Sequence, residues 1–248
     1  MGIQKTTPNI VTSGLLLYLD PANRLSYPAT GSTWSDLNGT GAQATLSAAS
    51  PGAAPVWNSK NQGVLVYDGT GSYASFPAST QYNFVGSPFT FTCWWLRRSA
   101  SCYVFTRGAL SANPITYTFQ TSPTGQLRII LYDGSGANQT IRTANTALPS
   151  GSWEHVACTY TGTGNAANMK LYQNGVEVTD TTVSSAGTFA SIKASTVNTY
   201  IGCFMPSGTY KATNSNMDLG IVQMYNRVLS AQEIAQNYNA HKSRYGVT

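Results

Sequence analysis

The chain has 248 residues, of which 42% are hydrophobic and only 9% are charged. Its net charge of +5 comes from few acids rather than many bases, and the basic residues form no run longer than Arg97-Arg98. Nucleic-acid binding usually needs a clustered basic surface, so this composition argues against it. The polar remainder is mainly Ser, Thr, Asn, Gln and Gly, which predicts a neutral surface suited to sugar hydroxyls or to contacts between subunits.

Residues 1–13 are polar and contain Pro8. We expect them to form an arm that attaches to a neighbouring protein or stays disordered. The start of the chain lacks the charged-then-apolar pattern of a secretory signal. No apolar run approaches the length of a membrane span. A protein with these features that acts outside the cell would leave by cleavage from a precursor, by a dedicated exporter or in a virus particle.

Strand signals dominate from residue 14 onward. Residues 15–19 form a short apolar run that ends at Asp20-Pro21, and residues 89–96 alternate between apolar and polar before an aromatic pair. Similar runs follow at 115–120, 126–132, 153–160, 169–173, 176–178, 199–202 and 219–225. Asn174-Gly175 separates two of these runs and favours a tight hairpin, because both residues tolerate positive φ. Short strands with turns between them predict an all-β, two-sheet antiparallel jelly-roll sandwich.

The end of the chain predicts one short C-terminal helix. Ser230 and Glu233 have the spacing of a capping box. Ile234 and Tyr238 lie four residues apart, which places them on one face that packs against the sandwich. The Gly-, Ala-, Ser- and Pro-rich stretch 38–60 is interpreted as a loop region and not as a linker, so residues 14–248 form one domain.

The four cysteines are not arranged like zinc ligands. None belongs to a Cys-x-x-Cys pair, and the chain has only two histidines, which argues against a structural zinc site. Cys93, Cys158 and Cys203 lie inside apolar runs, which favours buried, reduced thiols. A disulfide between Cys93 and Cys102 across a hairpin stays open as the alternative.

Several segments carry a family resemblance, and they occur in the family's order from residue 14 to about residue 240. They read GLLLYLD (14–20) with TWSDLNG (33–39), VYDGTGSY (66–73), WEHVACTY (153–160), LYQNG (171–175) and MYNRVLSAQEI (224–234). Together they resemble the concanavalin A-like lectin/glucanase superfamily in its laminin-G-like branch. The resemblance implies two stacked sheets, one of them concave, but this fold carries many activities. Similar openings are common in virion proteins of tailed phages.

An enzymatic role is not expected. Retaining glucanases with this fold resemble one another in a Glu-x-Asp-x-x-Glu strand, which places two catalytic carboxylates on one face. Here Glu154, Glu177 and Glu233 are far apart in sequence, and none matches that motif. No Gly-x-Ser-x-Gly element accompanies His155, which argues against Ser-His-Asp chemistry. We therefore predict a protein that binds and does not catalyse.

Calcium is the one cofactor that the resemblance suggests, and the sequence itself requires no cofactor. Relatives often hold calcium at the rim of the sandwich. Asp68 matches the first acid of the family's motif, but Ser72 replaces the second acid, which removes a charged ligand. Asp133 begins another candidate loop. The alternative for Asp68-Gly69 is an Asx turn that closes a hairpin.

Glycan binding requires an aromatic platform with amide or charged partners beside it. Trp94 and Trp95 are adjacent, so they point to opposite sheet faces, and we expect one in the core and the other on an outer or concave face with Arg97. Loop candidates for the same role are Tyr73, Tyr103, Tyr132 and Asn138.

These observations lead to a ranked set of functions. The first is a non-enzymatic virion surface protein, a capsid decoration or fibre module, that binds host or environmental glycans. It would contact other capsid or tail proteins through the N-terminal arm and form a homo-oligomer in the assembly. The alternative is an extracellular carbohydrate-binding or adhesion module of a secreted bacterial protein. A glycan hydrolase is a third alternative of low weight.

Overall fold

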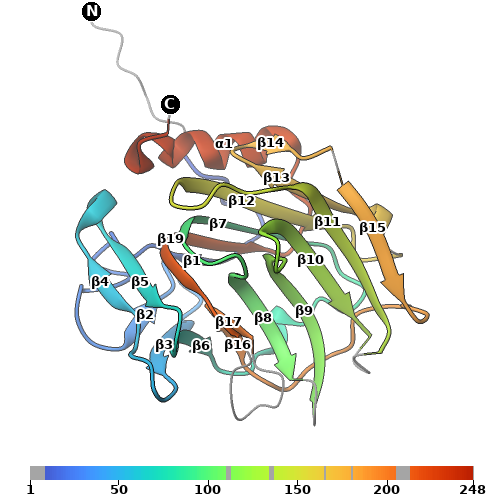
Figure 1. The fold of residues 1–248 in the computed structure, drawn as a ribbon, viewed down its shortest axis with the longest axis horizontal. Coiled ribbons are helices and arrows are strands. Elements are labelled where there is room, and N and C mark those ends of the chain that lie inside the picture. Colours follow the sequence, from blue (N-terminus) through green and yellow to red (C-terminus); the bar gives the residue numbers. More distant parts are fainter. Residues whose placement is uncertain are drawn as a thin grey trace, which may run out of the picture.

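The computed structural model describes residues 9–109, 113–133, 137–164, 166–179, 181–204 and 213–247. In these ranges the chain forms two large antiparallel sheets stacked face to face, with a helix along one side (Figure 1). This arrangement confirms the predicted two-sheet jelly roll with a short C-terminal helix.

Sheet A has eight strands. Its hydrogen-bonded order is β14 (Val176–Glu177), β13 (Met169–Gln173), β12 (Trp153–Tyr160), β7 (Phe89–Arg97), β19 (Asn216–Tyr225), β5 (Val64–Asp68) and β4 (Val56–Asn58), and β1 (Leu15–Leu19) also pairs with β19.

Sheet B has nine strands. Its order is β15 (Thr181–Ala186), β11 (Gln139–Ala147), β10 (Gln126–Tyr132), β9 (Asn113–Thr121), β8 (Tyr103–Ala109), β16 (Thr199–Ile201), β6 (Ser72–Phe76), β3 (Gln43–Ala48) and β2 (Thr33–Ser35). A small hairpin of β17 (Cys203–Phe204) and β18 (Thr213–Asn214) lies beside β8. The helical segments are η1 (Lys60–Gln62), η2 (Thr80–Tyr82), η3 (Ala166–Asn168), α1 (Ala231–His241) and η4 (Lys242–Tyr245).

Alternating side chains build the core between the sheets. On β10, Leu127, Ile129 and Leu131 are fully buried in the main core, while the residues between them point away from it. Aromatic rings fill the centre, with Phe89 and Phe91 stacked at 4.4 Å. Each such side chain contributes roughly 1.5–3 kcal/mol when fully buried. The sandwich is therefore held mainly by this shared apolar layer.

The hairpin at Asn174-Gly175 and the burial of the cysteines confirm the predictions made from the sequence. Asn174 and Gly175 have φ values of 51° and 80° in the turn between β13 and β14, as a type I′ hairpin requires. All four cysteines are buried thiols and none of them is in a disulfide, as expected for small hydrophobic residues. Burial raises the pKa of the Cys93 and Cys158 thiols well above the ordinary value.

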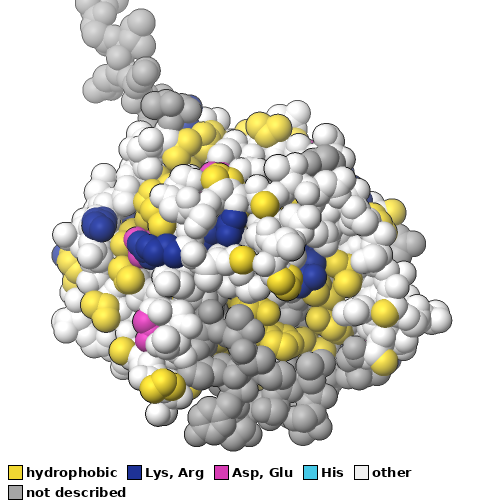
Figure 2. Space-filling view, viewed as in Figure 1, with side chains coloured by type: hydrophobic (Ala, Val, Ile, Leu, Met, Phe, Trp, Pro, Cys, Tyr) yellow, Lys and Arg dark blue, Asp and Glu magenta, His cyan; other side chains and the backbone are white. Residues whose placement is uncertain are grey.

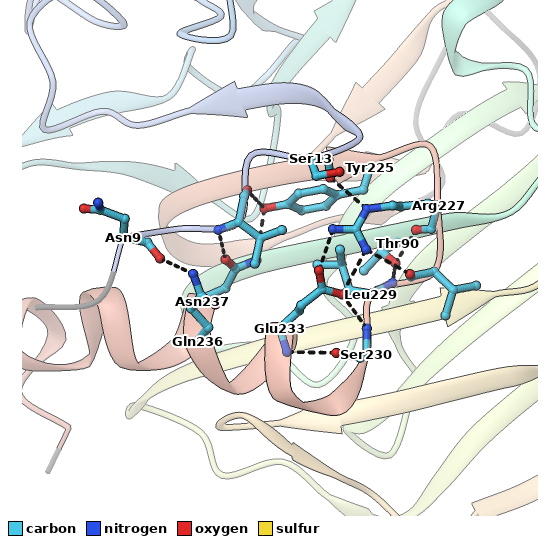
Figure 3. Close-up of polar contacts among 12 residues, drawn as sticks. Asn9, Ser13, Thr90, Tyr225, Arg227, Leu229, Ser230, Glu233, Gln236 and Asn237 are labelled. Carbon is cyan, nitrogen blue, oxygen red and sulfur yellow. Dashed lines mark hydrogen bonds and ion pairs between the residues drawn. The ribbon is translucent and has the colours of Figure 1, made fainter.

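A capping box starts helix α1, as predicted. The Ser230 hydroxyl accepts from the Glu233 N–H, and the Glu233 carboxylate accepts from the Ser230 N–H at 2.9 Å (Figure 3). Arg227 adds two contacts to the same carboxylate, at 2.6 and 2.9 Å. This arrangement fixes the direction in which α1 leaves β19. None of the described helices is long and apolar enough to cross a membrane.

Residues 9–13 of the expected arm lie against α1, while residues 1–8 are outside the described residues. Val11 is 7% exposed, and its N–H donates to Asn237 Oδ1 at 2.8 Å. The Tyr225 hydroxyl donates to the Val11 carbonyl, and the Gln236 amide donates to the Asn9 carbonyl (Figure 3). The chain therefore enters the domain at a fixed point beside α1.

Candidate functional site

The outer face of sheet A is closed by the C-terminal segment. Trp94 points outward from β7, but Tyr245 stacks on it at 4.5 Å and Tyr238 at 5.6 Å. Ile221 and Trp153 complete this cluster. A second cluster under α1 contains Leu15, Val11 and Ile234 among its members. These contacts bury Trp94, while Trp153 and Tyr238 are themselves half-buried.

The expectation for the tryptophan pair is therefore wrong in one respect. Trp94 is 1% exposed and Trp95 0%, so neither ring can receive a sugar. Arg97 shares the inward face of Trp95, is 5% exposed, and donates to the Leu148 and Ser99 carbonyls. The prediction differs from the structure because the C-terminal segment covers the outer face of sheet A, which alternation alone predicts to be exposed.

The outer face of sheet B differs, because aromatic and polar side chains from several strands meet on it. Tyr103 on β8 stacks on Phe204 of β17, with ring centroids 5.5 Å apart and an interplanar angle of 17°. Gln120 on β9 is directly opposite Tyr103, and Arg128 on β10 is directly opposite Gln120. We call Tyr103, Phe204, Gln120 and Arg128 the outer-face site.

Hydrogen bonds connect the members of the outer-face site. With its amide oxygen facing Arg128, Gln120 accepts from Arg128 Nη2 at 2.8 Å and from Nε at 3.2 Å, while its amide nitrogen donates to the Tyr103 hydroxyl at 3.2 Å. Arg128 has no acidic partner among the described residues. Partial burial lowers the pKa of Arg128, and the nearby Tyr132 and Tyr103 act in the opposite direction. The site thus presents a guanidinium that is bonded to an amide, without an acidic partner among the described residues, beside two aromatic rings.

Apolar and hydroxyl groups continue the site along the sheet. Tyr132 and Ile130 belong to a small cluster with Ile141 and Phe204, separate from the main core. Burial raises the pKa of Tyr132 to about 12, so its hydroxyl stays protonated. Figure 2 shows hydrophobic side chains gathered in a hollow over β8 to β10, with basic side chains at its border. The combination suits a ligand that has both an apolar face and many hydroxyls.

The structure thus brings two of the expected loop residues together and leaves two apart. Tyr103 and Tyr132 both lie on strands of the outer face. Tyr73 lies further along the same sheet, on β6, where it meets Tyr200 edge to face at 6.2 Å. Asn138 lies at the far end of β10 and β11, and its amide donates to Asp133 Oδ2 at 2.6 Å.

The expected calcium ligands at Asp68 do not fit a metal. Asp68 Oδ1 accepts from the N–H groups of Thr70, Gly71 and Ser72 at 2.7–3.0 Å, and Oδ2 accepts from the Ala53 N–H. The Ser72 hydroxyl donates to the Ala53 carbonyl. These donors hold the pKa of Asp68 below its usual range despite the opposing effect of desolvation. The carboxylate therefore closes a turn, and calcium at Asp133 remains an untested expectation.

Each described acid has a partner of its own. The pairs are Asp20 with Arg244, Asp218 with Arg98, Glu177 with Lys170, Glu233 with Arg227, Glu154 with Gln173 and Asn174, Asp36 with Thr40, Asp68 with its turn, and Asp133 with Asn138. In the described part of the chain, no three metal-ligating acids, histidines or cysteines form a group that could hold an ion.

The chain belongs to the concanavalin A-like lectin/glucanases superfamily, because residues 68–235 match a laminin-G-type model of that superfamily. No match is found among curated proteins.

Solved structures share the fold at low sequence identity. Trypanosoma rangeli sialidase in complex with sialic acid is 18% identical with a TM-score of 0.64, covering 97% of this chain and 36% of the sialidase. The binding domain of botulinum neurotoxin DC in complex with SialylT is 13% identical with a TM-score of 0.63, covering 92% of this chain and 52% of that one. A botulinum neurotoxin type C structure, for which cell entry is described as dependent on interaction with two ganglioside molecules, is 14% identical with a TM-score of 0.64. That match covers 92% of this chain and 52% of the toxin chain. The chain thus spans about a third of the sialidase and about half of the toxin chains.

Sequence reasoning missed Gln120, Arg128 and Phe204. Alternation along β9 and β10 places Gln120 and Arg128 on the outward face of the sheet, and this pattern could have identified them as surface candidates from the sequence. Their meeting with Tyr103 depends on the register of three strands. Phe204 lies in a hairpin about a hundred residues further along the chain than Tyr103, and no pattern in the sequence predicts the contact between the two rings.

Proposed function

We propose that this protein binds carbohydrate on the outer face of sheet B and does not transform it. The observation that carries the proposal is the Tyr103–Phe204 pair beside Gln120 and Arg128. The C–H face of a sugar ring packs against aromatic rings, and a guanidinium bonds its hydroxyls. Gln120 is 3% exposed and holds Arg128 and the Tyr103 hydroxyl in place by hydrogen bonds. One outer face thus offers both kinds of contact, while the other is closed by the C-terminal segment.

The partners of the acids support binding without catalysis. Most retaining glycosidases use two carboxyl groups about 5–5.5 Å apart, one of them as nucleophile, and sialidases use a tyrosine as nucleophile instead. Among the described acids, none lies on β8, β9 or β10, the strands that carry the outer-face site. Two of the three glutamates are occupied by Arg227 and Lys170. A hydrolase is therefore a less favoured proposal.

The setting we propose is a virion surface, where the domain would act as a capsid decoration or fibre module. The support is the phage-like opening of the sequence and the low proportion of charged residues. Other virion proteins would be bound through the N-terminal arm, and copies would form a homo-oligomer. The alternative is an extracellular adhesion module. Copies in symmetric arrays on purified particles would favour the first setting, and glycan binding by a free monomer the second.

Glycan-array screening followed by titration of the best ligand tests the binding proposal. Phe204→Ala removes half of the aromatic pair and should weaken binding about five- to tenfold. Leu25→Ala is the matched control, because Leu25 is 83% exposed and lies far from the outer face in the fold. Arg128→Gln keeps an amide beside Gln120 and should also weaken binding, whereas Lys60→Gln removes the same charge elsewhere without effect. Equal affinity of all four variants would refute the site, and release of reducing sugar would refute the non-enzymatic role.

A further inference from the structure

Two neighbouring cavities open at one end of sheet B, away from the outer-face site. The larger has a volume of about 380 Å³ and lies between the loop before β3 and the segment from the end of β6 to η2. The smaller has a volume of about 170 Å³ and lies between η2 and the segment before β16. Ala78 and Ser79 line both cavities, so the two adjoin at these residues, and we call them together the bipartite pocket.

The larger cavity has the chemistry of a sugar subsite. Gln43 and Gln81 supply amides, Thr40 and Ser79 supply hydroxyls, and the Tyr82 ring supplies an apolar wall. Burial raises the pKa of Tyr82 to about 12, so its hydroxyl, which is buried in the protein, stays neutral at neutral pH. Its volume is at the lower end of the range of pockets that hold small ligands. The described residues of its lining include no carboxylate, imidazole or cation.

A buried positive charge lies directly behind the smaller cavity. Arg107 on β8 is 0% exposed, and its Nη2 donates to the Ser195 carbonyl at 2.8 Å and to the Ser79 carbonyl at 2.9 Å. Its Nε donates to Asn83 Oδ1 at 3.3 Å. Ser79, Asn83 and Ser195 are three of the six described residues that line the smaller cavity. Only one residue layer therefore separates the guanidinium from the space.

Among the residues that the structure describes, the Arg107 charge has no counter-ion. Its hydrogen-bond partners are carbonyls, the Asn83 amide and the Thr199 hydroxyl, and none of the described acids pairs with it. The nearest titratable groups are the phenols of Tyr82 and Tyr117, and burial holds the pKa of each above its usual value. A buried charge is costly unless it is compensated, because the interior solvates it poorly. An anion in the adjacent cavity would supply the missing compensation.

We infer that the bipartite pocket binds a small acidic sugar, with the ring in the larger cavity and the carboxylate in the smaller one. The exposed Thr80 and Thr196 side chains around the smaller cavity offer hydroxyl donors to the carboxylate oxygens. The Arg107 charge selects the anion through the cavity wall. This site is separate from the outer-face site, and its existence does not depend on that proposal.

The test compares three ligands on the unmodified protein. Glucuronate and glucuronamide have the same ring and differ in charge, while acetate has the charge without the ring. Calorimetry or ligand-observed NMR should give glucuronate about tenfold tighter binding than glucuronamide, with a preference that weakens in high salt. Acetate should bind more weakly than glucuronate. Equal binding of glucuronate and glucuronamide overturns the role of the charge, and acetate as tight as glucuronate overturns the ring subsite.

A steric variant locates the site without disturbing Arg107. Ala78→Phe places a ring at the junction of the two cavities and should abolish glucuronate binding. Ala48→Phe adds the same ring at an exposed position at the other end of β3 and should leave binding unchanged. Melting temperatures show whether both variants are folded. Unchanged glucuronate binding in folded Ala78→Phe overturns the pocket, whereas Phe204→Ala should not affect it and thus separates this proposal from the outer-face site.

Discussion

His155 provides a quantitative test of the closed face of sheet A. Its side chain is 1% exposed and lies beside the rings of Trp94, at 5.3 Å, and Tyr238, at 6.0 Å. Its Nδ1 atom has no hydrogen-bond partner within the described structure. Burial lowers the pKa of His155 from 6.5 to about 3, with a smaller contribution from His241. The imidazole is therefore neutral in the folded protein under most conditions.

The pKa difference makes stability depend on pH. As the pH falls below 6.5 the unfolded chain takes up a proton at His155, whereas the folded chain does so only near pH 3. The contribution to stability is thus complete above pH 6.5 and is lost as the pH falls. One pKa unit corresponds to about 1.4 kcal/mol, so acidification from about pH 7 to about pH 4.5 should cost about 2.5 kcal/mol through this residue.

Urea unfolding at the two pH values measures this loss. His155→Phe keeps a ring beside Trp94 and Tyr238 but cannot be protonated, so its loss of unfolding free energy should be about 2.5 kcal/mol smaller than that of the wild type. Carboxylates such as Glu233, whose pKa is lowered to about 2, also destabilise the fold in acid, but they contribute equally to both proteins. Identical acid losses in the two proteins would refute the burial of His155 under the C-terminal segment.

Three further predictions concern the rest of the fold. The four buried thiols should not react with a thiol reagent in the native protein, and all four should react in denaturant; a rapid native reaction would contradict their burial. Asn237→Ala removes the bonds to the Val11 N–H and the Tyr225 hydroxyl and should lower the free energy of unfolding in urea by about 2 kcal/mol. An unchanged free energy of unfolding would show that residues 9–13 are not held against α1. Asp68→Ala should cost about 1 kcal/mol in calcium-free buffer, because the N–H groups of its turn lose their acceptor; a loss confined to calcium-containing buffer would indicate a metal site.

The fold could be predicted because its signals are local. Alternation on β7 and β10, the turn at Asn174-Gly175 and the capping box at Ser230 each depend on a few neighbouring residues. The structure confirms each of them. The order of motifs along the chain then pointed to the superfamily that the match over residues 68–235 shows.

The candidate site was predicted less completely because it depends on contacts between distant segments. Alternation correctly separated Trp94 from Trp95, but it contains no information on Tyr245, which covers Trp94 from 151 residues further along the chain. The Tyr103–Phe204 stack likewise joins strands far apart in sequence. Arg107 would be expected on a solvated surface from its charge, and only the packing of Ser79 and Ser195 around it reveals a buried cation.

A crystal structure of the protein with the best ligand from the glycan array tests the central claim most directly. We predict an intact sugar whose ring packs against Tyr103 and Phe204, with hydroxyl groups bonded to Arg128, which Gln120 holds in place. A cleaved sugar, or an intact one bound only at a place remote from these four residues, would contradict the claim.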